Sequence, residues 1–166
     1  MGDRVKQTLF AILEPDLPGA RILDLFAGSG GGGIEALSRG AASAVFVERD
    51  PVAAGVIDAN LRATNLAGPR NLVIRADVAA FIGRQAHEHL PFGIVLLDPP
   101  YSETDLRDRV LAWLGAPGIP LTPGARIVAK HFWRDRPPEQ IGLLASDRER
   151  RFGESALTFY RRQEGG

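Results

Sequence analysis

The sequence predicts an α/β protein built on a mostly parallel sheet with helices on both faces. Three observations predict this class. Short apolar runs alternate with segments of helical periodicity along most of the 166 residues. A glycine-rich turn follows the first apolar run and opens a helix. Two final runs flank Gly-Glu-Ser at 153–155, a pattern typical of an antiparallel hairpin. Strands that alternate with helices favour parallel pairing with right-handed crossovers.

The expected elements begin with a helix over 3–14, which Asp3 can cap and which has its apolar residues on one face. Five strands are expected at 21–26, 44–48, 71–75, 92–97 and 125–129, and hairpin strands at 146–152 and 156–161 bring the sheet to seven. Helices are expected at 31–39, at 51–64, from the Asp77 cap to about His89, at 105–114 and, as a short one, at 137–144.

Length and composition favour one domain over 1–166 with a substantial core. No apolar run approaches the roughly 20 residues that cross a membrane, and the N-terminus lacks the apolar core of a signal peptide, so we expect a cytoplasmic protein. The chain has no cysteine. His87, His89 and His131 show no paired metal spacing, so we expect no metal site.

The formal net charge is zero, so any basic surface for a nucleic acid must be local. Trp133 lies beside one of the basic clusters, where it could stack on a base or simply pack. The clusters are either phosphate contacts or solvated surface offset by nearby acids. They comprise Arg134 and Arg136; Arg148, Arg150 and Arg151; and Arg161 and Arg162.

The glycine turn is the most informative feature of the first half. Gly28, Gly30 and Gly33 match G-x-G-x-x-G, and Glu48 ends the next expected strand 20 positions after Gly28. Glycine allows positive φ and close approach of a ligand, and amide groups at a helix start would face that ligand. Alone, the pattern fits a dinucleotide site with Glu48 on the ribose hydroxyls, or a tight strand–helix turn without a ligand.

Asp24 lies inside an apolar strand, where an unpaired carboxylate is costly. Either backbone amides of the adjoining turn donate to it, or a cationic ligand lies nearby. A sulfonium cofactor with an amino-acid tail would supply positive charge, whereas Asp24 would repel the pyrophosphate of NAD. Asp24 therefore favours a methyl donor.

Asp98-Pro99-Pro100-Tyr101 directly follows the apolar run 92–97. The prolines have fixed φ and no N–H, so they form a stiff turn whose carbonyl oxygens are free to accept from a ligand. Asp98 and a proline carbonyl could accept the two N–H bonds of an exocyclic amino group, while Tyr101 stacks on the base. The alternative is a simple turn that ends a strand.

These stretches resemble known motifs. LDLFAGSG at 23–30, Val-Glu at 47–48 and LDPPY at 97–101 look like motifs of class I S-adenosylmethionine-dependent methyltransferases that act on amino groups of nucleobases. More narrowly, the stretches 3–10, 35–41 and 151–160 resemble the bacterial 16S ribosomal RNA guanine-N2 methyltransferase family. The resemblance covers nearly the whole chain and implies a three-layer α-β-α Rossmann-like methyltransferase fold.

The resemblance also implies the reaction: a methyl group passes from S-adenosyl-L-methionine to N2 of a guanine, leaving S-adenosyl-L-homocysteine. The residues 21–90 would form the cofactor half and 92–162 the target-base half. The implied partner is 16S ribosomal RNA within a 30S assembly intermediate, with no membrane, and the implied oligomeric state is a monomer.

By position in the family motifs, Asp24, Gly28 and Gly30 would line the methionine end of the cofactor, and Glu48 would bind the ribose hydroxyls. Asp77 would meet the adenine amino group, and it could at the same time be an ordinary N-cap. The candidate cofactor-binding residues are Asp24, Phe26, Ala27, Gly28, Ser29, Gly30, Glu48, Arg49, Asp77 and Val78. The candidate catalytic residues are Asp98, Pro99, Pro100 and Tyr101.

The sequence departs from the family at several positions. Gly31-Gly32 replaces a larger apolar pair, Gly93 stands where an acid is common, and Lys130 stands after the fifth expected strand where an acid is frequent. Most members also carry a basic N-terminal extension with a β-hairpin, which this sequence does not contain.

Three other functions remain open from the sequence. An adenine-N6 DNA methyltransferase would use the same acidic Pro-Pro aromatic turn, although this chain shows no separate target-recognition domain. A cofactor-binding module without catalysis could act in ribosome assembly. An NAD-dependent oxidoreductase would use the glycine turn, but Asp24 argues against it.

Overall fold

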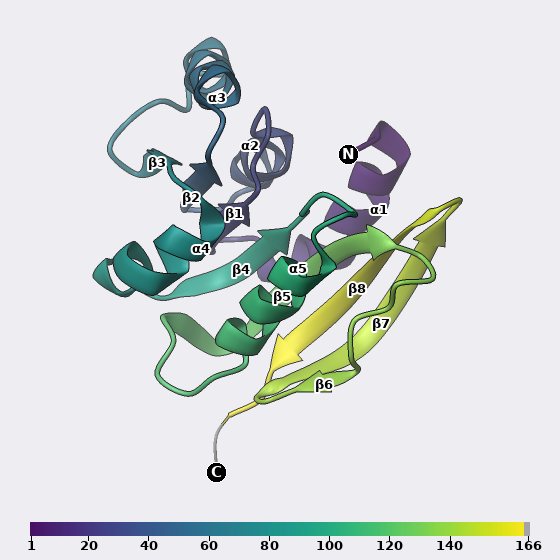
Figure 1. Cartoon of the computed structure of the whole chain (residues 1–166). Helices are drawn as coiled ribbons and strands as arrows, with labels where there is room; N and C mark the ends of the chain where they lie inside the picture. Colours follow the sequence, from purple (N-terminus) through teal and green to yellow (C-terminus); the bar gives the residue numbers. More distant parts are fainter. Residues whose placement is uncertain (165–166) are drawn as a thin grey trace.

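The computed structural model describes residues 1–164, and these residues form one eight-stranded sheet in the order β3-β2-β1-β4-β5-β8-β7-β6 (Figure 1). The first five strands are parallel, and the last three add an antiparallel end. The predicted fold class is therefore confirmed, with eight strands in place of seven. The strands are β1 (Arg21–Leu25), β2 (Ser43–Glu48), β3 (Asn71–Arg75), β4 (Phe92–Leu97), β5 (Leu121–Phe132), β6 (Gln140–Ile141), β7 (Leu144–Phe152) and β8 (Ser155–Arg162).

Helices cover both faces of this sheet (Figure 1). They are α1 (Asp3–Leu13), α2 (Gly31–Ser38), α3 (Pro51–Ala63), α4 (Val78–Ala80) and α5 (Thr104–Leu114). Alternate residues of β1 point to opposite faces. Ile22 packs with Phe10 of α1 in one apolar cluster, and Leu23 packs with Val110 of α5 in the other. Asp24 follows on the face of Ile22, which α1, α2 and α3 cover. No helix in residues 1–164 is long and apolar enough to cross a membrane.

The expected helix at 137–144 is wrong. This segment forms the short strand β6, whose Gln140 and Ile141 pair with the start of β7. The chain reverses at Gly142, which has φ of +57°. A Cβ at Gly142 would lie 2.4 Å from the Gly115 carbonyl oxygen, so the reversal requires glycine. A glycine turn between paired strands therefore replaces the helix that Pro137 seemed to open.

The helix expected between Asp77 and His89 is broken into three short pieces. The α-helical turn α4 continues as a π-helical turn (Phe81–Gln85) and a 3-10 turn (Ala86–Glu88). Asp77 occupies the N-cap position, but its side chain makes no capping hydrogen bond. The predicted Asp3 cap of α1 is wrong, because Gly2 is the N-cap. Asp3 instead lies in the first turn, a position where negative charge is favourable.

The sheet order places the ends of β1 and β4 side by side. Leu25 pairs with Leu97 in the parallel register, so the glycine turn and the Asp98 turn leave the sheet as neighbours. The chain runs outward from β1 to β3 and then returns to β4, which makes this gap the topological switch point of the sheet. Ligands of open α/β sheets bind at such a point, outside the carboxyl ends of the strands.

Candidate functional site

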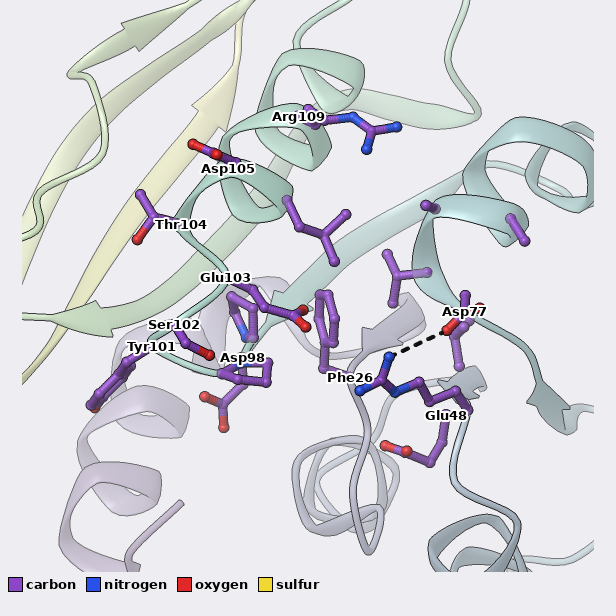
Figure 2. A pocket seen from close by; sticks show the side chains of 18 of the residues that line it. Phe26, Glu48, Asp77, Asp98, Tyr101, Ser102, Glu103, Thr104, Asp105 and Arg109 are labelled. Atoms are coloured by element: carbon purple, nitrogen blue, oxygen red, sulfur yellow. Dashed lines mark ion pairs between the residues drawn. The ribbon is translucent and has the colours of Figure 1, made fainter.

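Two adjoining cavities lie at the carboxyl ends of the parallel strands. The larger has a volume of about 1250 Å³ and the smaller about 220 Å³. Phe26, Asp98 and Lys130 line both. In Figure 2, Glu48 and Asp77 lie on one side of the larger cavity, Asp98 and Tyr101 lie on the other, and Phe26 stands between them.

The structure brings together all but one of the residues predicted for the site. The larger cavity is lined by Phe26, Glu48, Arg49, Asp77, Val78, Asp98, Pro99, Pro100 and Tyr101. The smaller is lined by Asp24, Phe26, Ala27, Gly28, Ser29 and Asp98. Gly30 lines neither. It is buried as the N-cap of α2 with φ of +85°, and a Cβ there would lie 3.1 Å from Ile57.

Asp24 is the buried acid of the site, with 5% of its surface exposed. Its Oδ2 accepts a hydrogen bond of 3.0 Å from the Gly33 amide, at the start of α2. Burial raises the pKa of Asp24 to about 7, the Gly33 hydrogen bond opposes that shift, and the nearby Asp98 and Glu48 add to it. Asp24 therefore has a backbone partner and still lines the smaller cavity.

The stability of the protein should depend on pH through Asp24. Because its pKa is about 7 in the folded state and 3.8 in the reference state, the folded protein binds more protons between these values, and stability falls as pH rises through them. From pH 4.5 to 7.5 this group should lower the free energy of unfolding by about 3 kcal/mol. Asp24→Asn keeps an acceptor for Gly33 and should remove this part of the pH dependence in urea unfolding.

The exposed Asp58, on α3, provides the matched control. Asp58→Asn should leave the pH dependence as it is in the native chain. If Asp24→Asn gave a pH profile parallel to that of the native chain, the raised pKa of Asp24 would be refuted.

Glu48 is held by two backbone amides. Its Oε1 accepts from Gly28 at 2.8 Å, and its Oε2 accepts from Asp50 at 2.9 Å. Asp50 in turn caps α3 by accepting from Val52 at 3.3 Å. Since each carboxylate oxygen has a second lone pair, Glu48 retains acceptor capacity toward a pair of ligand hydroxyls.

Phe26 has a left-handed backbone, with φ of +61°. This conformation is a genuine outlier for a bulky residue, and such strain gathers at ligand sites. The next amide, of Ala27, donates to the Val47 carbonyl at 3.1 Å and anchors the turn to β2. The sequence motif includes Phe26 but gives no signal of this conformation.

Arg49 and Asp77 form an ion pair at the rim of the larger cavity, with Nη1 and Oδ1 3.7 Å apart (Figure 2). The two side chains are 70% and 64% exposed. Exposed pairs of this kind contribute little to stability. The buried Val78 follows Asp77 directly and gives this end of the cavity an apolar wall.

Lys130 is a functional candidate that the sequence motifs indicate only as a departure from the family. It lies within β5, not after it, because β5 extends to Phe132. Its Nζ is 3.5 Å from Asp98 Oδ1 and 5.1 Å from the centroid of the Tyr101 ring. The sequence signal that could have identified Lys130 is its charge, because it follows a run of apolar residues expected to be buried in a strand. Lys130 supplies positive charge to one Asp98 oxygen and leaves the other for a ligand.

The two prolines of the turn differ in what their carbonyl groups do. The Pro100 carbonyl accepts from the Glu103 amide at 2.9 Å and so closes the turn. Within residues 1–164, no hydrogen bond reaches the Pro99 carbonyl. Asp98 and the Pro99 carbonyl are therefore the two neighbouring acceptors that the turn offers to a ligand.

The donor set of the two cavities fits a ligand with two chemically different ends. The smaller cavity has both acidic and basic side chains, Asp24 and Lys6, as a zwitterionic amino acid requires. Gly31 and Gly32 line the wall between them and leave it without side chains. The larger cavity offers Glu48 and Asp77 as acceptors, which suits a nucleoside. No group of three His, Cys, Asp or Glu side chains in the described chain could hold a metal ion.

The sheet order and the two neighbouring turns define the fold of a class I methyltransferase. The structure described as "Putative methyltransferase yhhF from Escherichia coli" superposes with a TM-score of 0.87 over 98% of this chain and 87% of that one, at 31% identity. A Salinibacter ruber RNA methyltransferase solved with S-adenosyl-L-homocysteine shares the fold at 17% identity, with a TM-score of 0.71 over 99% of this chain and 94% of that one.

The chain belongs to the family described as "Conserved hypothetical protein 95", whose model matches residues 1–161. It is 36% identical over 161 residues to the Bacillus subtilis protein named "Putative rRNA methyltransferase YlbH", and the alignment covers 97% of this chain and 86% of that protein. It is 40% identical over 100 residues to the Haemophilus influenzae "Ribosomal RNA small subunit methyltransferase D", covering 60% of this chain and 51% of the relative. That match therefore spans about half of the relative. The family resemblance drawn from the sequence is confirmed.

Proposed function

We propose that this protein transfers a methyl group from S-adenosyl-L-methionine to the exocyclic N2 of a guanine in 16S ribosomal RNA. The observation that carries the proposal is the junction of the two cavities at Phe26 and Asp98. A cofactor that spans the glycine turn and a base held by the Asp98 turn would meet there. The names of the relatives support ribosomal RNA as the substrate.

The cofactor would lie across the carboxyl ends of β1 and β2 and the start of α4. Asp24 and Lys6 would receive the amino and carboxylate groups of its methionine end, Glu48 the ribose hydroxyls, and Asp77 the adenine amino group. Once bound, the cofactor supplies a methyl group on a positively charged sulfur. The backbone of Phe26 and Ala27 would form the wall along which the cofactor passes from one cavity to the other.

The Asp98 turn would orient the nucleophile. The Asp98 carboxylate and the Pro99 carbonyl would accept from the target amino group and align its nitrogen with the methyl carbon, which is the main catalytic contribution. The nitrogen would form a bond to the methyl carbon as the bond from that carbon to sulfur breaks, with the electron pair left on sulfur. The Asp98 charge would stabilise the positive charge that develops on nitrogen, and the nitrogen would then lose its proton to Asp98 or to bulk water. Tyr101, 43% exposed, would stack on the base.

The acceptors of the turn favour guanine. Guanine presents an N1–H donor next to its N2 amino group, and the Asp98 carboxylate could accept from N1–H in addition to the amino group. The adenine edge has an N1 acceptor beside its amino group, which a carboxylate would repel. Asp98 with the Pro99 carbonyl therefore supports guanine over the adenine-N6 alternative.

Labelled methyl transfer provides the test of this function. The protein and labelled S-adenosyl-L-methionine would be incubated with unmethylated 30S particles, naked 16S RNA and DNA, and the modified base would be mapped. Label at N2 of one guanine in the RNA is the expected result. Label in DNA adenine, binding of the cofactor without any transfer, or binding of NAD in its place would each refute the proposal. A comparison of the transfer rates to 30S particles and to naked 16S RNA also tests the prediction that a 30S assembly intermediate is the substrate.

The cytoplasmic location and the monomeric state remain predictions. Sedimentation of the purified chain would test the second.

A further inference from the structure

A continuous aromatic strip leads away from the site along the end of β5. The centroids of the Tyr101 and Phe132 rings are 6.3 Å apart, and those of Phe132 and Trp133 are also 6.3 Å apart. The Tyr101 hydroxyl is hydrogen-bonded to Ser155, at the start of β8. The strip therefore connects the Asp98 turn with the tip of the β7–β8 hairpin, which lies at the same end of the sheet (Figure 1).

Two guanidinium groups stack on the indole at the far end of this strip. The Arg151 Cζ lies 3.6 Å from the Trp133 ring centroid, and the Arg134 Cζ lies 4.6 Å from it. Arg151 comes from β7 and also donates from Nε to the Gly153 carbonyl at 2.9 Å. Both arginines are exposed, and neither forms an ion pair with any residue in the described range 1–164.

Most arginines of the other basic clusters are engaged by the protein itself. Arg136 pairs with Glu149 at 3.0 Å. Arg161 lies 3.6 Å from Asp16, and Arg162 donates to the Ala116 carbonyl at 2.7 Å. Arg148 also forms no ion pair within residues 1–164. What distinguishes Arg134 and Arg151 is therefore their shared place over the Trp133 indole, at the end of the aromatic strip.

We propose that Trp133, Arg134 and Arg151 form a docking surface for single-stranded RNA beside the target nucleotide; this inference rests on the proposed function. The indole holds both guanidinium groups in place, so that their N–H edges can bind phosphate oxygens and their planes can stack on bases. Tyr101 and Phe132 provide the path between this surface and the site. Because the net charge of the chain is zero, such a local basic surface supplies the attraction that the whole protein does not.

The test compares two double variants with the same change in charge. Arg134→Gln/Arg151→Gln removes the stacked pair, and Arg136→Gln/Arg150→Gln removes two other exposed arginines of the same region as the matched control. Binding of fluorescein-labelled single-stranded RNA of mixed sequence would be measured by anisotropy over a range of salt concentrations. The first variant should bind about tenfold more weakly at low salt, and its salt slope should fall by about 1.4, since each phosphate contact on a single strand contributes about 0.7. The control should change neither value.

Calorimetric titration with S-adenosyl-L-methionine separates this inference from the proposed function. Its affinity should be the same in both double variants, since none of the four arginines lines the site cavities. Equal RNA binding by the two variants would overturn the docking surface and leave the methyltransferase proposal intact. Normal binding of RNA by Arg134→Gln/Arg151→Gln, with loss of transfer to 30S particles alone, would assign the surface to a protein partner instead. Absence of RNA binding and of transfer in the native chain would overturn both.

As an independent check, Trp133→Leu should weaken RNA binding even though both arginines remain. Thermal unfolding would establish that this variant is folded. Unchanged RNA affinity in the folded Trp133→Leu variant would refute the role of the indole.

Discussion

Replacement of Asp98 by asparagine should lower kcat for methyl transfer by about 100-fold or more, the scale on which single electrostatic groups act in active sites. The affinity for S-adenosyl-L-methionine should stay the same. Asparagine removes the negative charge that faces the developing positive nitrogen, and it can direct an N–H group at a base edge made of donors. Single-turnover transfer to ribosomal RNA would measure the rate, and calorimetry would measure cofactor affinity.

Asp105→Asn is the matched control, because Asp105 is an exposed carboxylate on α5 that lines the same cavity away from the turn. It should retain transfer. A second variant addresses Lys130, whose Nζ would lose its partner 3.5 Å away in Asp98→Asn. If Asp98→Asn/Lys130→Met recovered native activity, the loss would have come from the unpaired lysine, and the assigned role of Asp98 would be wrong.

Gly33→Ala should destabilise the fold by about 2 kcal/mol or more, because overpacking a dense core costs about 1 to 3 kcal/mol and at times more. An added Cβ would lie 2.4 Å from Cε1 of the buried Phe46 ring and 3.2 Å from Asp24 Oδ2. The gain in helix propensity, about 1 kcal/mol, offsets only part of that cost. Displacement of Asp24 should also weaken cofactor binding. Urea unfolding and calorimetry would measure the two effects.

Gly55→Ala is the matched control for this helix glycine. Gly55 lies on the exposed side of α3, and a Cβ there would meet no atom within 4 Å. This substitution should raise the free energy of unfolding by about 1 kcal/mol, because alanine favours the helix. If the two variants changed stability in the same direction, the steric account of Gly33 would be wrong.

Local sequence patterns predicted the parallel half of the sheet closely. The expected strands 71–75 and 92–97 have the observed bounds, because turn-forming residues bound both segments. The helix predicted at 137–144 was wrong because the structure of this segment depends on other parts of the chain. Gly142 packs against Gly115, and β6 forms by pairing with β7. The start of β5 was missed for a similar reason. Pro123 and Gly124 resemble a turn, and the register shift between β4 and β5 accommodates them.

The residues of the site could largely be predicted from motifs, whereas their interactions could not. The pairs Asp98–Lys130 and Trp133–Arg151 each join residues from different elements, and the order β4-β5-β8-β7 brings these elements together. The left-handed backbone of Phe26, in the turn after β1, is a conformation that the residue type does not reveal. Asp24 was recognisable as unusual, but its partner Gly33 became clear only from the path of the turn.

The two hydrogen bonds of Glu48 have a consequence for ligand affinity. The carboxylate accepts from Gly28 and Asp50, so the turns after β1 and β2 are joined through one side chain before any ligand arrives. Ordering of these turns is therefore part of folding, and the conformational entropy lost on binding is smaller than for a mobile loop. This preorganisation makes Glu48 serve both recognition and rigidity, so a ligand meets acceptors that already have their final positions.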